Sequence, residues 1–336
     1  METYTIFKLK NLTPLHMGTG KENYDFSASE LQSDTISAAL AAMRAQQGRA
    51  ADIEAFLSSF SISSAFPYLQ CGEDVIYFLP KPLCKLNIVV KGEKEEQYRK
   101  RLKKIQFIDA SLWQELIGGK QLLIEAAQLQ GTFLFSENSA ALSSTLYKSQ
   151  VLQRVSVPRA DGEDATPFFF EWTFFDRNSG LYCLIDAAQS DMEQEIEQLF
   201  TALGENGIGT DRSVGGGRFE IEKECLTLSF PHESNAAMLL SLYIPAEQEM
   251  ESLQLMNASY SLLQRGGYIS GSDEVNLRHL RKRSVYMFSV GSLFPTKAEM
   301  LKGKVVNLRP AYNSEKMHPV FRSGLPLAIP FKIIEV

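Results

Sequence analysis

The stretch that decides the fold is GENGIGTDRSVGGGRF, from Gly204 to Phe219, which holds six glycines and two arginines. Upstream, DMEQEIEQLFTAL (191–203) places apolar residues at helical spacing and acids in the first turn, and it predicts a helix with Gly204 as its left-handed C-terminal cap. Downstream, RFEIEKE (218–224) alternates apolar and polar residues, as a half-buried strand does. The predicted order is therefore helix, glycine loop, strand.

This order excludes two well-known phosphate-binding loops. The Rossmann turn and the Walker loop run from strand to helix, so that the phosphate meets a helix N-terminus. The stretch also lacks the GxGxxG spacing and the Gly-Lys-Ser/Thr ending. What remains is a loop of exposed amide groups with Arg212 and Arg218 beside them, which suits the approach of a phosphate backbone. The alternative is a glycine-rich turn that only lets two elements pack closely.

Length and composition exclude several classes of protein. The 336 residues are enough for two domains of ordinary size, and no apolar run approaches the ~20 residues of a membrane span. The N-terminus lacks the apolar core of a signal peptide, so a cytoplasmic location is expected. Four cysteines and four histidines are scattered, which predicts neither a metal site nor a cofactor. The net charge of −6 argues against a freestanding, strongly basic nucleic-acid binder but permits one basic groove.

Patterns elsewhere in the chain predict short strands, a few helices and one long hairpin, whereas 118–150 carries no clear pattern. The expected elements are a strand at 3–12, helices at 33–43 (capped by Ser33 or Asp34), 51–60 and 109–117 (capped by Asp109 or Ser111), a projecting hairpin within 150–169, and a strand at 284–290. The basic runs at 99–104 and 277–283 are typical of solvated helix faces. Recurring strand, helix and strand units predict an α+β fold of two related sandwiches.

Several of these segments together resemble one family. TPLHMGTG (13–20), SDTISAAL (33–40), GIGTDRSVGGGRFEI (207–221), QRGG (264–267) and HPVFRSGLPLAIPF (318–331) occur in the order found in the RAMP superfamily of CRISPR proteins. Within it, the chain resembles the fourth subunit of the type III-A effector, the Csm complex. The resemblance implies two ferredoxin-like, RRM-like domains, with a glycine-rich loop and a projecting thumb hairpin. We place the first domain, with loop and thumb, at 1–225 and the second at 226–336.

The resemblance also implies a function. Such a subunit is an RNA-binding scaffold in antiviral defence that holds the 5′ handle of the CRISPR RNA. It joins the large polymerase-like (Cas10-type) subunit to the backbone RAMP subunits, and it is non-catalytic. The GGDD motif expected in the large partner is absent from this sequence, which fits the smaller subunit.

The candidate RNA-binding residues come from the glycine loop, the segment after the first strand, the thumb and the QRGG turn. They are His16, Gly18, Lys21, Lys148, Arg154, Arg159, Gly209, Arg212, Ser213, Gly215, Gly216, Gly217, Arg218, Arg265 and Gly266. Asp211 is interpreted as a residue that orients an arginine or braces the loop, rather than as a metal ligand. Val157 at the thumb is apolar and suits insertion between nucleotides.

The segment His16–Lys21 is expected beside the glycine loop, at the end of the first strand. His16 itself leaves alternatives open. It can stack on a base, bind a phosphate, or be a histidine hydrogen-bonded within the sheet. It can also serve as an acid–base catalyst with Lys21 and Tyr24 nearby, because related RAMP endoribonucleases use a histidine in this region. The alternative function is therefore a metal-independent endoribonuclease that processes CRISPR repeat RNA. For Arg265 and Gly266, a plain turn is the alternative to a place in the RNA groove.

Overall fold

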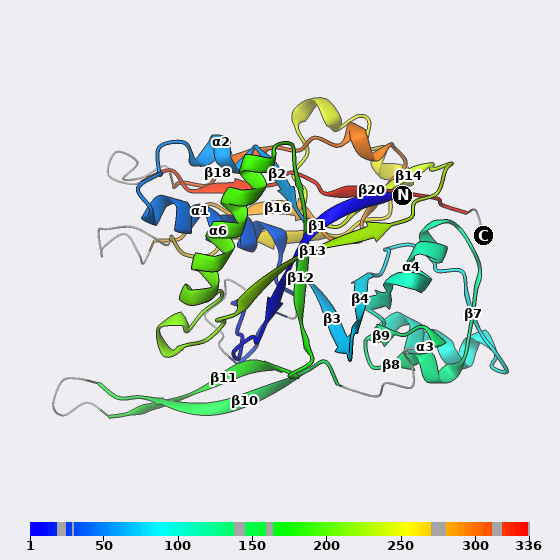
Figure 1. The fold of residues 1–336 in the computed structure, drawn as a ribbon, viewed down its shortest axis with the longest axis horizontal. Coiled ribbons are helices and arrows are strands. Elements are labelled where there is room, and N and C mark those ends of the chain that lie inside the picture. Colours follow the sequence, from blue (N-terminus) through cyan, green and yellow to red (C-terminus); the bar gives the residue numbers. More distant parts are fainter. Residues whose placement is uncertain are drawn as a thin grey trace.

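The computed structural model describes residues 1–18, 25–28, 30–137, 145–158, 164–269, 280–310 and 318–334, and shows a mixed α+β architecture (Figure 1). Its α-helices are α1 (Ser33–Gln46), α2 (Ile53–Leu57), α3 (Glu95–Lys104), α4 (Ala110–Ile117) and α6 (Ser190–Asn206). Its short 3₁₀ helices are η1 (Ala126–Gln128), η2 (Arg212–Val214), η3 (Glu247–Glu249), η4 (Leu255–Asn257) and η6 (Ala298–Met300).

The strands are β1 (Glu2–Lys10), β2 (Phe60–Ile62), β3 (Phe66–Cys71), β4 (Asp74–Pro80), β5 (Ile88–Val90), β6 (Phe107–Asp109), β7 (Leu122–Ile124), β8 (Leu129–Gln130), β9 (Phe133–Leu134), β10 (Tyr147–Ser156), β11 (Thr166–Phe175), β12 (Ser179–Ala187), β13 (Glu220–Leu228), β14 (Ala236–Leu239), β15 (Leu262–Arg265), β16 (Val285–Phe288), β17 (Leu293–Phe294), β18 (Val305–Asn307), β19 (Phe321–Ser323) and β20 (Ala328–Phe331). Most strands are short, and five of them have nine or ten residues: β1, β10, β11, β12 and β13.

One large sheet organises the molecule. Its strands lie in the order β13-β1-β12-β3-β4-β6-β9-β8, and β2 also pairs with β12. β1 is central, because it pairs antiparallel with β12 on one side and with the full length of β13 on the other, from Glu2↔Leu228 to Lys10↔Glu220. The strand that follows the glycine loop is therefore the direct neighbour of the first strand, and the end of β1 meets the end of the loop.

Alternation along β1 divides the interior into two cores. Phe7 and Leu9 face one side of the sheet, where they pack with apolar residues of α1 and α6. Ile6 faces the other side and belongs to a second core, which includes Tyr182, Trp113 and residues of the C-terminal strands β14 and β20. α1 and α6 thus cover one face of the sheet, and the C-terminal segments help to cover the other.

β10 and β11 form a two-stranded hairpin that leaves the body of the molecule (Figure 1). Their pairing runs from Tyr147↔Phe175 to Ser156↔Thr166, and a single bridge, Leu15↔Thr173, ties the hairpin to the segment after β1. The predicted hairpin is therefore confirmed and is longer than expected. Arg159 at its tip lies outside the described residues, as do Lys21, Tyr24 and residues 277–279.

The helices predicted at 33–43, 109–117 and 191–203 are confirmed, and Asp109 caps α4 by accepting a hydrogen bond from the Ser111 amide. Two predicted caps are wrong. Gly204 lies inside α6, where its backbone packs against Phe219, and the helix ends before Gly207, whose φ is 80°. The N-cap of α1 is Gln32 without a side-chain cap, because Ser33 accepts a hydrogen bond from the Leu242 amide and Asp34 binds arginine.

Candidate nucleic-acid interface

The glycine loop is held by the segment that follows β1. Thr13 Oγ1 donates to the Gly215 carbonyl and accepts from the Arg218 amide, each at 2.8 Å. The Gly217 amide donates to the Pro14 carbonyl, and the Thr210 amide donates to the His16 carbonyl, each at 3.0 Å. The prediction that His16 and its neighbours lie beside the glycine loop is confirmed, and Gly18 contacts the Thr210 side chain across the same boundary.

Most of the glycines serve close packing. A Cβ on Gly217 would lie 1.9 Å from the Ile208 carbonyl oxygen, one on Gly209 would lie 2.5 Å from the His16 oxygen, and one on Gly216 would lie 2.6 Å from the Trp172 ring. Gly207 meets a neighbouring carbonyl in the same way, whereas a Cβ on Gly215 would meet nothing within 4 Å. The alternative interpretation of the sequence, that the glycines let two elements pack closely, therefore accounts for most of the glycines in the loop.

The prediction of a loop of exposed amides is wrong for most of its length. The amides of Ile208, Thr210, Gly216 and Gly217 donate to carbonyls of the loop or of the 13–16 segment. In the outer turn, Arg212–Gly215, the side chains of Arg212, Ser213 and Val214 are exposed, and Arg218 is exposed beside it. The surface that remains for a ligand is this outer turn rather than the glycines themselves.

Arg154 joins the hairpin to the loop. Its guanidinium forms an ion pair with Asp211, a left-handed residue (φ 59°) that opens the outer turn. The same guanidinium lies over the rings of Phe170 and Trp172, 4.4 and 5.3 Å from their centroids. The prediction that Asp211 orients an arginine and braces the loop is confirmed. Arg154 is thus fixed by charge and by aromatic stacking between two elements far apart in sequence.

His16 lies underneath this surface and is only 1% exposed. Its Nδ1 donates to the Glu171 carbonyl at 2.7 Å, and its ring packs on Phe170 with centroids 4.3 Å apart. Of the alternatives left open by the sequence, the hydrogen-bonded structural histidine fits this geometry. Lys148 is exposed near the base of the hairpin, where it is paired in register with Phe174.

Arg265 and Gly266 are not part of this surface. Arg265 donates through Nε and Nη2 to the two carboxylate oxygens of Asp34 at 2.9 Å each, and it also donates to Thr35. Asp34 is fully buried at the start of α1 and also pairs with Arg322, which is 5% exposed. The structure therefore places Arg265 in a buried cluster that links α1 to the C-terminal segments, and Gly266 packs against Ser284.

Lys282 lies close enough to Arg265 to be affected by its charge. Burial and the charge of Arg265 lower the pKa of the Lys282 ammonium to about 8, and burial lowers the pKa of Arg322 to about 10. Asp34 is therefore paired with two arginines, and Lys282 adds a further positive charge near Arg265. Sequence reasoning missed Asp34, Arg322 and Lys282 as a group, because nothing local in the sequence connects residues so far apart.

The hairpin aromatics were also missed as site residues. Phe168, Phe170, Trp172 and Phe174 alternate along β11 and share one side of the hairpin, and Phe170 and Trp172 are the pair under Arg154. The two-residue period of FFFEWTFF was a usable signal for this shared face.

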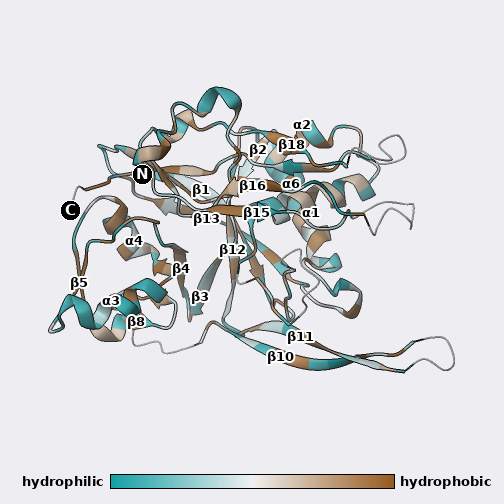
Figure 2. Ribbon diagram, turned by 180° about the vertical axis from the view of Figure 1, so that it is seen from behind, coloured by the Kyte–Doolittle hydropathy of each residue, from teal (hydrophilic) through white to brown (hydrophobic). Residues whose placement is uncertain are grey.

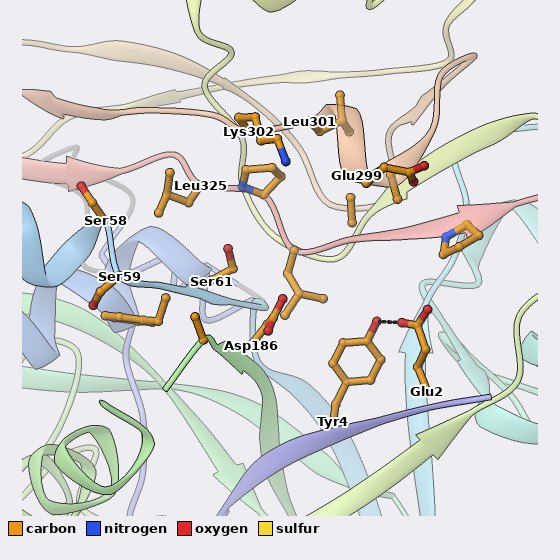
Figure 3. Close-up of a pocket in the computed structure, with 17 residues that line it drawn as sticks. Glu2, Tyr4, Ser58, Ser59, Ser61, Asp186, Glu299, Leu301, Lys302 and Leu325 are labelled. Atoms are coloured by element: carbon orange, nitrogen blue, oxygen red, sulfur yellow. Dashed lines mark hydrogen bonds between the residues drawn. The ribbon is translucent and has the colours of Figure 1, made fainter. Parts of the chain in front are cut away.

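A cavity among the described residues lies elsewhere (Figure 3). It measures about 500 Å³ and includes Glu2, Asp186 and Glu299 in its wall, and the Tyr4 hydroxyl donates to Glu2 at 2.8 Å. Burial, and then the hydrogen bond with Glu2, raise the pKa of Tyr4 far above its usual value. It lies at the start of β1, whereas the glycine loop meets the end of β1 about 27 Å away. The carboxylates in its wall disfavour a phosphate ligand.

Two further features bear on the class of protein. No helix among the described residues is long and apolar enough to cross a membrane. Within the same residues, no three His, Cys, Asp or Glu side chains gather closely enough to hold a metal ion.

Comparison with known proteins gives a consistent result. The family model described as CRISPR Csm4 C-terminal domain matches residues 232–331. The protein named CRISPR system Cms protein Csm4 of Streptococcus thermophilus is 25% identical over 97% of this chain and 98% of its own length. The protein of the same name from Mycobacterium tuberculosis (strain CDC 1551 / Oshkosh) is 25% identical over 80% of this chain and 79% of its own length.

Solved structures share the fold. The Csm3-Csm4 subcomplex of the type III-A CRISPR-Cas interference complex contains a chain with TM-score 0.65 and 18% identity, over 98% of this chain and all of that one. A chain of the Csm1-Csm4 cassette in complex with cA4 matches with TM-score 0.59 and 18% identity, over the whole of both chains. Family model, relatives and fold agree, and the chain is similar to CRISPR Csm4 proteins over nearly its whole length.

Proposed function

We propose that this chain is the RNA-binding scaffold subunit of a type III-A effector, which caps the 5′ handle of the CRISPR RNA. The observation that carries the proposal is the Arg154–Asp211 pair, which joins the hairpin to the outer turn and leaves Arg212, Ser213 and Arg218 exposed beside it. Exposed guanidiniums on a braced backbone suit sequence-independent phosphate contacts. In this proposal the hairpin is the thumb of the superfamily.

The same proposal assigns partners and domains. The chain bridges a Cas10-type large subunit and the backbone RAMP subunits, since similar proteins were solved as Csm1-Csm4 and Csm3-Csm4 assemblies. Residues 1–225 form a ferredoxin-like domain, supported by the strand order β13-β1-β12-β3 with α1 and α6 on one face. Residues 226–336 form the second domain.

The subunit is proposed to be non-catalytic and without a cofactor. The rival function, a metal-independent endoribonuclease, needs a histidine that reaches the scissile phosphate. His16 is buried, and its Nδ1 is occupied by the Glu171 carbonyl, which speaks against that role.

The test is RNA retention by the Arg212→Ala/Arg218→Ala variant. Each charge-assisted hydrogen bond lost should weaken binding of the 5′ handle by about 1–3 kcal/mol, while the melting temperature stays close to that of the parent. Equal retention by a folded double variant would show that the site assignment is wrong. Rapid metal-free cleavage of repeat RNA that requires His16 would replace the scaffold with the endoribonuclease.

A further inference from the structure

Basic residues are concentrated in one short segment of this acidic chain. The whole chain has 34 lysines and arginines against 40 acidic residues, whereas residues 81–104 hold nine basic residues and only three acidic ones. Helix α3 carries most of this excess in the run RKRLKK. Such segregation gives one part of the surface a local charge opposite in sign to that of the molecule.

α3 packs through one side only. Tyr98 is buried in the core, Leu102 packs against that core, and Ile105 directly after the helix is buried as well. On the rest of the helix, Arg99, Lys100, Lys103 and Lys104 are exposed. The ribbon of α3 is correspondingly coloured as hydrophilic in Figure 2.

The four exposed side chains, Arg99, Lys100, Lys103 and Lys104, form what we call the α3 basic face. Within the described part of the chain, none of the four has an ion pair or a side-chain hydrogen bond. Two neighbours differ, because Arg101 pairs with Glu93 and Lys91 pairs with Glu125. The face therefore carries four positive charges without a direct ion pair, and the helix has two acids, Glu95 and Glu96, in its first turn.

The four charges of the α3 basic face are more than the C-terminus of the helix needs for its stabilisation. Lysines in a last turn stabilise the carbonyls that have no helical partner. Lys81 already does so from outside the helix, because its Nζ donates to the carbonyls of Leu102 and Lys103 at 3.3 Å each. A solvated, purely stabilising face is thus a weaker explanation here than for an ordinary basic helix.

The composition of the face indicates the kind of partner. Protein–protein interfaces are depleted in lysine and enriched in aromatic residues, whereas clustered lysine and arginine along a helix is the footprint of a nucleic-acid contact. Among described residues, α3 exposes no large apolar side chain. Arg99 and Lys103 are four residues apart, as are Lys100 and Lys104, so each pair lies about 6 Å apart and can follow successive phosphates.

We propose that the α3 basic face is a second, sequence-independent contact for the phosphates of a single-stranded RNA, separate from the outer turn of the glycine loop. The inference rests on the proposed function, since it assumes that the subunit carries RNA. α3 and the base of the β10–β11 hairpin occupy the same lower side of the molecule in Figures 1 and 2. The hairpin extends from its base away from α3, so α3 is a second basic surface on the opposite side of the hairpin base from the hairpin tip.

The experiment measures binding of a fluorescein-labelled, 40-nucleotide single-stranded RNA of mixed sequence to the full chain between 50 and 200 mM salt. The test variant is Lys100→Ala/Lys103→Ala/Lys104→Ala. The matched control, Lys120→Ala/Lys297→Ala/Lys302→Ala, removes the same charge from exposed positions elsewhere. Alanine favours the helix, and thermal melting by circular dichroism verifies folding. A charge-preserving variant, Lys100→Arg/Lys103→Arg/Lys104→Arg, tests whether charge alone is needed.

We expect the test variant to lose about tenfold in affinity at 100 mM salt, and its salt slope to decrease by about 2, since each single-strand phosphate contact contributes about 0.7. The control should stay within about twofold of the parent, and the arginine variant should bind like the parent. Equal losses in test and control variants would overturn the inference. So would a test variant that binds RNA normally but no longer associates with its partner subunits, because the face would then contact protein.

Measuring Arg212→Ala/Arg218→Ala in the same series separates this inference from the proposed function. Loss in that variant alone supports the outer turn and overturns the α3 contact. Loss in the α3 variant alone supports the α3 contact and contradicts the assignment of the outer turn.

Discussion

Two arginine–aspartate contacts in this molecule look equivalent in sequence and differ completely in structure. Arg154 and Asp211 are about 30% exposed and join the hairpin to the outer turn. Arg265 and Arg322 share Asp34, which has no exposed surface, where α1 meets the C-terminal segments. An exposed pair contributes little to stability and can arrange a surface, whereas a buried carboxylate among cations is needed for the fold. Burial, not residue type, decides which arginines are available to a ligand.

The largest expected effect is on the buried contact. Asp34→Asn keeps the shape of the side chain but leaves Arg265 and Arg322 without their shared carboxylate, so the free energy of unfolding should decrease by about 3–5 kcal/mol. Asp211→Asn is the matched control at the exposed pair, with an expected loss of at most about 1 kcal/mol. Urea unfolding of both variants measures the difference. Similar losses in the two variants would remove the distinction between the contacts.

A second comparison lies within the glycine loop. Gly217→Ala should destabilise the protein by about 2–4 kcal/mol, because its φ is 67° and the new Cβ would overlap the Ile208 carbonyl. Gly215→Ala shares the positive φ but points into open space, so the expected loss is about 1 kcal/mol. Thermal melting of the two variants is the measurement. Equal shifts in melting temperature would show that backbone conformation alone, not close packing, explains these glycines.

The smallest effect has the opposite sign. The pKa of Lys282 is lowered to about 8 from 10.5. At pH 7 the ammonium is still charged in the folded protein, and keeping it charged there lowers the free energy of unfolding. Between about pH 8 and pH 10.5 the unfolded chain binds more protons there, and stability from this group increases with pH. Lys282→Met should therefore raise the free energy of unfolding at pH 7 by about 1–3 kcal/mol and flatten this increase. Lys302→Met, at an exposed position, is the control. A destabilised Lys282→Met variant would mean that the cluster needs the cation.

The sequence was sufficient for features that depend on local pattern. The helices α1, α4 and α6, the projecting hairpin and the helix–loop–strand order around the glycines all follow from periodicity and turn residues. The position of His16–Lys21 beside the glycine loop was also predicted, and it is confirmed for His16, the described residue whose carbonyl accepts from Thr210. Local pattern could not tell that Gly204 lies within α6, since its close approach to Phe219 depends on where β13 docks.

Arginines were the harder problem. Arg154, Arg212, Arg218 and Arg265 all occur near turn residues, and sequence gives each the same chemistry. The structure separates them by partners that come from elsewhere: Asp211 and two aromatic rings for Arg154, and Asp34 for Arg265. His16 likewise looked reactive in sequence and is buried because the hairpin covers it.

The contact between Gly216 and Trp172 has an optical consequence. The chain contains two tryptophans, Trp113 and Trp172. Trp113 is fully buried and donates through Nε1 to the Pro80 carbonyl in the core, whereas Trp172 lies under Arg154 and against Gly216, at the base of the outer turn. In a Trp113→Phe background, intrinsic fluorescence would come from the indole beneath the outer turn alone. Any ligand that moves the Arg154 guanidinium or the loop backbone should change its emission, so the protein carries its own reporter of occupancy.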